Sequence, residues 1–217
     1  DEMDANGGGQ VLFDEFADWS IKHHMDLEDD DDAADAGKGG GLIAKKFSTQ
    51  SKKGAQESPK KGSQAKSAPK VDWSAIAKSL PWQTDAKSTK ARAVLWKKMD
   101  MNGNGLSSLA EFDKVVVKDL KLGDVITKPV MMRAFQASKD ANTSGNKADH
   151  PDFVDKSEFR LLLQYTRQYL ELWVMFETID TGDDRRIDRE EMVKAKGLLV
   201  KWGGDKMKNV NVVKAFD

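Results

Sequence analysis

The chain has 217 residues, with 35 Lys and Arg against 36 Asp and Glu, so its formal net charge is −1. It contains no Cys and three His, which excludes disulfides and thiolate metal sites and argues against a zinc site or a His-dependent catalytic triad. A near-neutral charge, no phosphate-binding glycine loop and no run of 18 apolar residues argue against a nucleic-acid binder, an enzyme and a membrane-spanning chain.

The first 25 residues contain a calcium-loop pattern. An EF-hand loop has twelve residues, with oxygen ligands at positions 1, 3, 5, 7, 9 and 12 and a glycine at position 6. We expect five ligand positions in this loop: Asp4, Asn6, Gly8, Gln10 and Glu15. A water must replace the missing side chain at Gly8, so we expect weak affinity. The alternative is a flexible glycine-rich segment. Phe16 and Trp19 continue the predicted exiting helix.

Residues 26–70 are predicted to be a linker. Seven acidic residues fall within 26–35, and nine Lys with many Gly, Ser, Ala and Pro fall within 38–70. So few apolar residues cannot offset the entropy of ordering the segment. The Lys-rich part is either a solvated spacer or a contact for an acidic polymer such as a tubulin surface.

Residues 71–217 are predicted to form an all-α EF-hand domain. Apolar residues recur at helical intervals before Asp100, from Phe112 to Val116 and from Phe159 to Tyr169. No convincing β-hairpin pattern occurs between these segments.

The segment 100–111 gives the best match to a calcium loop. The predicted ligands are Asp100, Asn102, Asn104, the backbone carbonyl of Leu106 and the bidentate carboxylate of Glu111, with Ser108 at position 9. Gly105 lies at position 6, where the chain turns with positive φ. Ser107 is an unusual residue for position 8, which normally pairs with another loop. The alternative is an Asx turn between two helices.

A second calcium-loop candidate, 180–191, is less complete. Its predicted ligands are Asp180, Asp184, Arg186 through its carbonyl, Asp188 and Glu191. Gly182 offers no ligand at position 3, and Arg185 replaces the glycine at position 6, where positive φ costs about 1 kcal/mol. Both readings stay open here: calcium binding, or a loop kept as a scaffold.

The segment 140–158 resembles an expanded loop that has lost its ligands. Lys147 stands where the first Asp belongs, although the second half, up to Glu158, keeps a loop-like pattern. We expect no ion there, and we expect the segment to pair structurally with 100–111.

The loop at Asp4 lacks an incoming helix, which we expect near 206–217. Val210, Val213 and Phe216 have helical spacing there. One hand is then split between the two ends, as in a circularly permuted chain or one period of a tandem array. We favour an array with an extended linker, in which a neighbouring repeat completes the split hand. Phe13, Phe16 and Trp19 would then lack partners within this chain.

Several segments resemble the calflagins, the flagellar calcium-binding proteins of trypanosomatids. These segments are Asp72–Pro81, Trp96–Asp100, Asp152–Leu162, Glu171–Asp180 and Phe13–Trp19. The resemblance implies a four-EF-hand Ca²⁺ sensor of the flagellum. Calflagins begin with an acylated Met-Gly-Cys, which this sequence does not contain, so membrane anchoring is not implied.

Two functions are consistent with these patterns. The first is a calcium-binding repeat unit associated with the axoneme or another part of the flagellar cytoskeleton. The alternative is a free Ca²⁺ sensor that exposes an apolar groove to a target protein or membrane. Candidate groove residues are Met131, Met132, Trp173 and Met175, although core packing explains the same residues.

Overall fold

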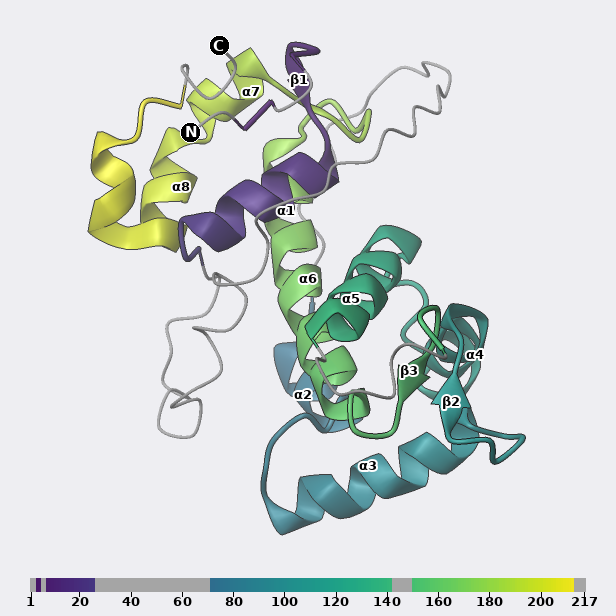
Figure 1. Ribbon diagram of the computed structural model, residues 1–217. Helices are drawn as coiled ribbons and strands as arrows, with labels where there is room; N and C mark the ends of the chain where they lie inside the picture. The colour runs from purple at the N-terminus through teal and green to yellow at the C-terminus, as the bar shows by residue number, and fades with distance from the viewer. Residues whose placement is uncertain (1–2, 5–6, 26–70, 142–149, 213–217) are drawn as a thin grey trace. The chain divides into compact units, whose positions relative to one another are not determined.

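The computed structural model describes residues 3–4, 7–25, 71–141 and 150–212 (Figure 1). The chain is mostly helical, as predicted. It divides into two compact units, one within Asp1–Pro69 and Glu171–Asp217 and the other within Lys70–Leu170. No helix among the described residues has the length and apolar character needed to cross a membrane. The predicted linker lies outside the described residues.

The unit Lys70–Leu170 begins with two capped helices. Helix α2 (Trp73–Ser79) starts at Asp72, whose carboxylate accepts the Ala75 N–H at 3.0 Å. Helix α3 (Ala86–Met99) starts at Asp85, which caps the next amides in the same way. These side chains satisfy N–H groups that have no partner within the helix, and so fix where each helix begins. Helix α3 then leads directly into the loop at Asp100.

The rest of this unit contains two loops joined by a short strand pair. The elements are β2 (Leu106–Ser107), α4 (Leu109–Lys114), a π-helical segment (Val115–Asp119), α5 (Lys128–Ala141), β3 (Val154–Asp155) and the first part of α6 (Phe159–Ile179). Strands β2 and β3 are antiparallel, with Ser107 opposite Val154, so loop 100–111 pairs with the described end of 140–158, as predicted. Ser107 is fully buried in this pair despite its polarity.

The core of this unit lies between these helices. Trp96 of α3 packs on Phe159 of α6 with ring centroids 5.2 Å apart, and Phe112 of α4 lies near Phe135 of α5. All four rings are buried, which accounts for the helical spacing of apolar residues in the sequence. Val94, which shares that spacing, is 61% exposed and faces solvent.

The other unit brings residues near the start of the sequence against residues far along it. Its elements are β1 (Gln10–Val11), α1 (Phe13–Lys22), the second part of α6, β4 (Ile187–Asp188), α7 (Arg189–Lys194), α8 (Lys196–Gly203) and a 3₁₀ helix (Gly204–Asn209). Strand β1 pairs antiparallel with β4, with Val11 opposite Ile187. Figure 1 shows α1 alongside α6 in this unit.

Aromatic contacts hold α1 against α6. Phe13 lies edge-on to Trp173 at 4.8 Å between ring centroids, and Phe16 lies edge-on to Phe176 at 5.8 Å. The expectation that the N-terminal helix lacks partners within this chain is therefore wrong. Its apolar face would cost free energy if left in water, and the aromatic side chains of α6 bury it within the same chain.

The predicted incoming helix near 206–217 is only partly described. The chain forms the 3₁₀ helix Gly204–Asn209, and Val210 then has extended backbone, with φ −74° and ψ 123°. Val213 and Phe216 lie outside the described residues. The described part of this stretch is thus not an α-helix, and the prediction for the remainder is untested.

Replacing Phe16 by Ala tests the packing of α1 within the chain. Phe16 is fully buried against Phe176, so the substitution should lower the free energy of unfolding by about 3–5 kcal/mol. Leu12→Ala is the control, because Leu12 is 44% exposed, and it should change stability by less than about 1 kcal/mol. Denaturant unfolding in the presence of chelator measures both. Equal, small losses for the two variants would contradict the intrachain packing.

Candidate metal centres

The loop 100–111 is organised around the carboxylate of Asp100. Its Oδ1 accepts the N–H of Asn104 at 3.0 Å, and its Oδ2 accepts the N–H of Gly105 at 2.9 Å. The side-chain oxygens of the two asparagines follow the same pattern: Asn102 Oδ1 accepts the N–H of Asn104, and Asn104 Oδ1 accepts that of Leu106. These bonds turn three predicted ligand side chains toward the loop's own backbone.

Glu111 closes this loop from the first turn of α4. Its Oε2 accepts the N–H of Ser108 at 2.8 Å and the Ser108 hydroxyl at 2.9 Å, while Ser108 Oγ accepts the N–H of Glu111. This reciprocal cap fixes the carboxylate at the helix start. Among the described residues, none donates a hydrogen bond to the other oxygen, Oε1.

The loop 4–15 has the same framework. The carboxylate of Asp4, which is buried, accepts the N–H groups of Gly8 at 3.0 Å and Gly9 at 2.6 Å. Glu15 Oε2 accepts the N–H of Leu12 at 3.0 Å, as Glu111 does for Ser108. Asn6 lies outside the described residues. The Gln10 side chain accepts a hydrogen bond from Arg186 Nη1 at 2.7 Å. The group of Gln10 predicted to bind an ion is therefore the backbone carbonyl.

The loop 180–191 repeats the framework with different residues. Asp180 accepts the N–H groups of Asp184 at 3.3 Å and Arg185 at 2.8 Å, and Asp184 in turn accepts that of Arg186 at 3.0 Å. Burial raises the pKa of the Asp180 carboxyl above its usual value, against the opposing effect of these N–H donors. A cation in the loop would favour the ionised carboxyl.

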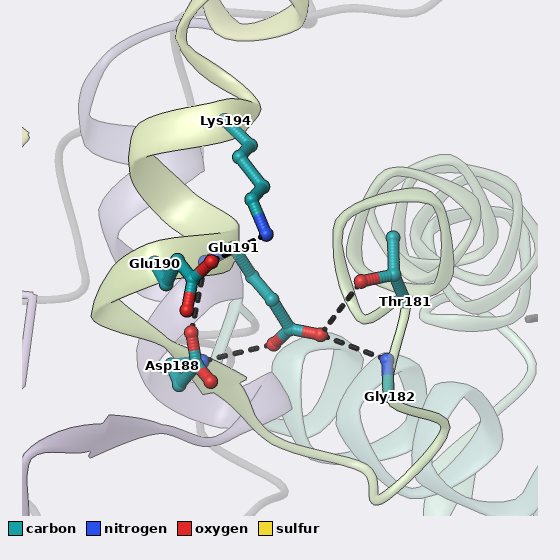
Figure 2. Close-up of polar contacts among 6 residues, drawn as sticks. All are labelled: Thr181, Gly182, Asp188, Glu190, Glu191 and Lys194. Atoms are coloured by element: carbon teal, nitrogen blue, oxygen red, sulfur yellow. Dashed lines mark hydrogen bonds and ion pairs between the residues drawn. The ribbon is translucent and has the colours of Figure 1, made fainter. Parts of the chain in front are cut away.

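Glu191 differs from Glu111 in its second oxygen (Figure 2). Its Oε2 accepts the N–H of Asp188 at 3.0 Å, which is the usual cap of α7. Its Oε1 reaches back across the loop and accepts the N–H of Gly182 at 2.8 Å and the hydroxyl of Thr181 at 3.0 Å. The sequence analysis did not predict the contact between Thr181 and Glu191. The one feature of the sequence that pointed toward it was the absence of a side chain at position 3, Gly182.

Two residues in each loop have left-handed backbone, at positions 4 and 6. In loops 4–15 and 100–111 these residues are glycines, with φ between 68° and 79°: Gly7, Gly9, Gly103 and Gly105. In loop 180–191 they are Asp183, with φ 53°, and Arg185, with φ 64°. The positive φ predicted for Arg185 is thus confirmed, and the loop bears strain that the others avoid.

The described segment 150–158 has the geometry of the second half of a loop. Glu158 Oε2 accepts the N–H of Asp155 at 2.9 Å, and Asp155 Oδ1 accepts the N–H of Glu158 at 3.0 Å. This is the same cap as at Glu111 and Glu191. Lys147, at the predicted first position, lies outside the described residues.

The donor sets differ in how well they suit a metal. In the described part of the chain, no three carboxylate or imidazole groups converge on one point. A metal in loop 100–111 would therefore depend on amide, hydroxyl and carbonyl oxygens as well as two carboxylates, a mixture that Ca²⁺ accepts because it takes six to eight oxygens. Loop 180–191 fits less well, because both oxygens of Glu191 already accept hydrogen bonds.

The sequence is similar to a group of proteins from trypanosomes. Residues 76–166 match the family model described as FCaBP EF-hand domain. The flagellar calcium-binding protein TB-24 of Trypanosoma brucei brucei is 33% identical over 167 residues, covering 76% of this chain and 77% of the relative. The flagellar calcium-binding protein of Trypanosoma cruzi is 32% identical over 133 residues, covering 60% of this chain and 63% of the relative.

A longer relative aligns with nearly the whole chain. The flagellar calcium-binding protein TB-44A of Trypanosoma brucei brucei is 30% identical over 206 residues, which is 94% of this chain. The chain spans 44% of the length of that relative, less than half.

The left-handed positions can be tested by exchanging glycine and a larger residue. Gly105→Ala leaves open space around the new Cβ but keeps φ near 79°, so it should lower the free energy of unfolding by about 1–2 kcal/mol. Arg185→Gly should raise it by no more than about 1 kcal/mol, because the unfolded glycine is more flexible. Denaturant unfolding with chelator gives both values.

The helical Gly197→Ala is a control of opposite sign. No atom lies within 4 Å of the new Cβ, and Ala is a better helix former, so stability should rise by up to about 1 kcal/mol. If Gly105→Ala behaves like Gly197→Ala, the left-handed backbone at position 6 is not required.

Proposed function

Because this chain belongs to the flagellar calcium-binding protein family, we propose that it binds Ca²⁺ in EF-hand loops and that 100–111 is its best site. The arrangement around Glu111 supports this choice. The carboxylate is fixed by the cap of α4, yet its Oε1 accepts no hydrogen bond from the described residues. One oxygen is thus positioned and the other is available for an ion at low cost.

The residues proposed to hold this ion are Asp100, Asn102, Asn104, the carbonyl of Leu106 and Glu111, with Ser108 contributing through a water. Their oxygens are hard ligands of the kind Ca²⁺ takes. The bound ion would supply positive charge that joins the start of the loop to α4. The hydrogen bonds of Asp100 to the backbone shape the loop before the ion arrives, which reduces the ordering needed on binding.

We propose loop 4–15 as a second and weaker site. Asp4, Asn6, the carbonyl of Gln10 and Glu15 would contribute oxygens, and a water would replace the side chain absent at Gly8. The bonds from Gly8 and Gly9 to the buried Asp4 support a preformed loop. Fewer side-chain ligands lower its expected affinity.

The four loops are proposed to form two EF-hand pairs. Strands β2 and β3 join 100–111 to 147–158, and β1 and β4 join 4–15 to 180–191. In both, position 8 of one loop faces position 8 of the other, the register expected if the second half of each loop is of the EF-hand type.

The chain is proposed to be a repeat unit of a larger protein of the flagellum. The names of its relatives describe them as flagellar proteins, and the TB-44A relative is more than twice as long as the part of it that this chain matches. A contact between residues 38–70 and tubulin or another cytoskeletal protein is a further proposal from the sequence.

The buried methionines favour packing over a permanent target groove. Met131, Trp173 and Met175 are 3%, 9% and 0% exposed, whereas Met132 is 58% exposed. A sensor function would therefore require the loops to open these cores on binding Ca²⁺.

Glu111→Gln tests the proposed site. Losing one carboxylate oxygen at position 12 should remove one Ca²⁺ per chain, measured as stoichiometry by isothermal titration calorimetry. Glu158→Gln is the matched control, because Glu158 makes the same cap in a segment proposed to hold no ion, and it should leave the number of ions unchanged. An unchanged stoichiometry in Glu111→Gln would refute the choice of this loop.

A further inference from the structure

We propose that loop 180–191 is closed by Glu191 instead of by an ion, so that this hand is a calcium-independent scaffold for loop 4–15. The contacts of Glu191 with Thr181, Gly182 and Asp188 are called the Glu191 bridge here. The bridge concerns the ion-free chain and does not depend on Ca²⁺ binding elsewhere. Its role toward loop 4–15 rests on the proposed function.

The Glu191 bridge uses both oxygens of the carboxylate (Figure 2). Oε1 accepts the Gly182 N–H at 2.8 Å and the Thr181 hydroxyl at 3.0 Å, and Oε2 accepts the Asp188 N–H at 3.0 Å. Hydrogen bonds to an ionised group are among the stronger ones in proteins. An ion held by both oxygens would have to displace at least one of the two bonds to Oε1, a cost that does not arise at Oε1 of Glu111, to which no described residue donates.

The absence of a side chain at Gly182 leaves room for the bridge. A Cβ built on Gly182 would lie 3.3 Å from Glu191 Oε1 and 3.8 Å from Asp180 Oδ1. Any larger residue would therefore crowd the carboxylate in its present position. Glycine at this position thus has two effects, since it removes one ligand and lets Glu191 reach the backbone.

In loop 100–111 of the same chain, the last carboxylate does not reach across the loop. Asn102 occupies the position equivalent to Gly182, and its amide oxygen accepts the N–H of Asn104. Glu111 keeps the cap to Ser108, but no described residue donates to its Oε1. Two loops with the same framework therefore differ in whether the last carboxylate spans the loop.

The closed loop also contacts its partner loop. Strand β4 pairs with β1, and the Arg186 guanidinium donates to Gln10 Oε1 at 2.7 Å. The nearby ion pair of Glu190 and Lys194 does not contribute to the bridge, because it is local to α7 and both side chains are largely exposed. Glu191 is therefore the residue that joins the two ends of loop 180–191 and presents β4 to loop 4–15.

Hydrogen exchange of the full chain in chelator tests the bridge. The amides of Gly182 and Asp188 should be protected in the parent protein, and Glu191→Gln should speed the exchange of at least one of them by about tenfold, since the single acceptor oxygen of Gln cannot serve both. Thr181→Val should produce a smaller change at Gly182 alone. Glu111→Gln should leave both amides unchanged. Equal exchange of these amides in the parent protein and Glu191→Gln would overturn the proposal.

Calcium stoichiometry by calorimetry tests the consequence. Glu191→Gln should leave the number of ions unchanged, and Gly182→Asp should add one ion, because it displaces Glu191 Oε1 and supplies a ligand at position 3. Gly182→Ala crowds the carboxylate without supplying a ligand and should add none. Loss of one ion in Glu191→Gln would overturn the scaffold. No loss in Glu111→Gln would instead refute the proposed function, while the exchange result would still decide the bridge.

Discussion

In each of three loops, the carboxylate of the first residue accepts two adjacent backbone N–H groups and gives the loop its shape. Asp4, Asp100 and Asp180 each hold the amides of the fifth and sixth loop residues. Holding both amides bends the chain so tightly that the residues at positions 4 and 6 become left-handed. The short strand after this bend then faces its partner loop, and the next helix starts at a fixed place.

The sequence predicted those features that depend on spacing along the chain. The positions of Gly105 and Arg185 predicted positive φ, because loop geometry is local. The partner of Phe16 was predicted wrongly. Its aromatic face required burial, but spacing says nothing about which surface provides it, and Phe176 provides it within the same chain. The assumption of an extended linker led the prediction away from that contact.

The Glu191 contacts could not be predicted because they depend on how close the two ends of a loop come. From the sequence, Gly182 is a ligand lost. In the folded loop, the missing side chain at Gly182 also leaves room for Glu191 Oε1 to accept the Gly182 N–H. An effect of this kind depends on Cβ positions a few ångströms apart, and a linear pattern contains no such distances.

The strand pairs differ greatly in the length of chain that each closes. Ser107 and Val154 are 47 positions apart (154 − 107), whereas Arg186 and Gln10 are separated by 176 positions. Loop-closure entropy grows with the logarithm of this length, so the second closure costs about 1 kcal/mol more. The unit within Lys70–Leu170 can therefore form from nearby contacts alone. The other unit forms only when the N-terminal loop and helix contact α6 and β4. Folding of the chain should therefore proceed in two stages, with the more local unit first.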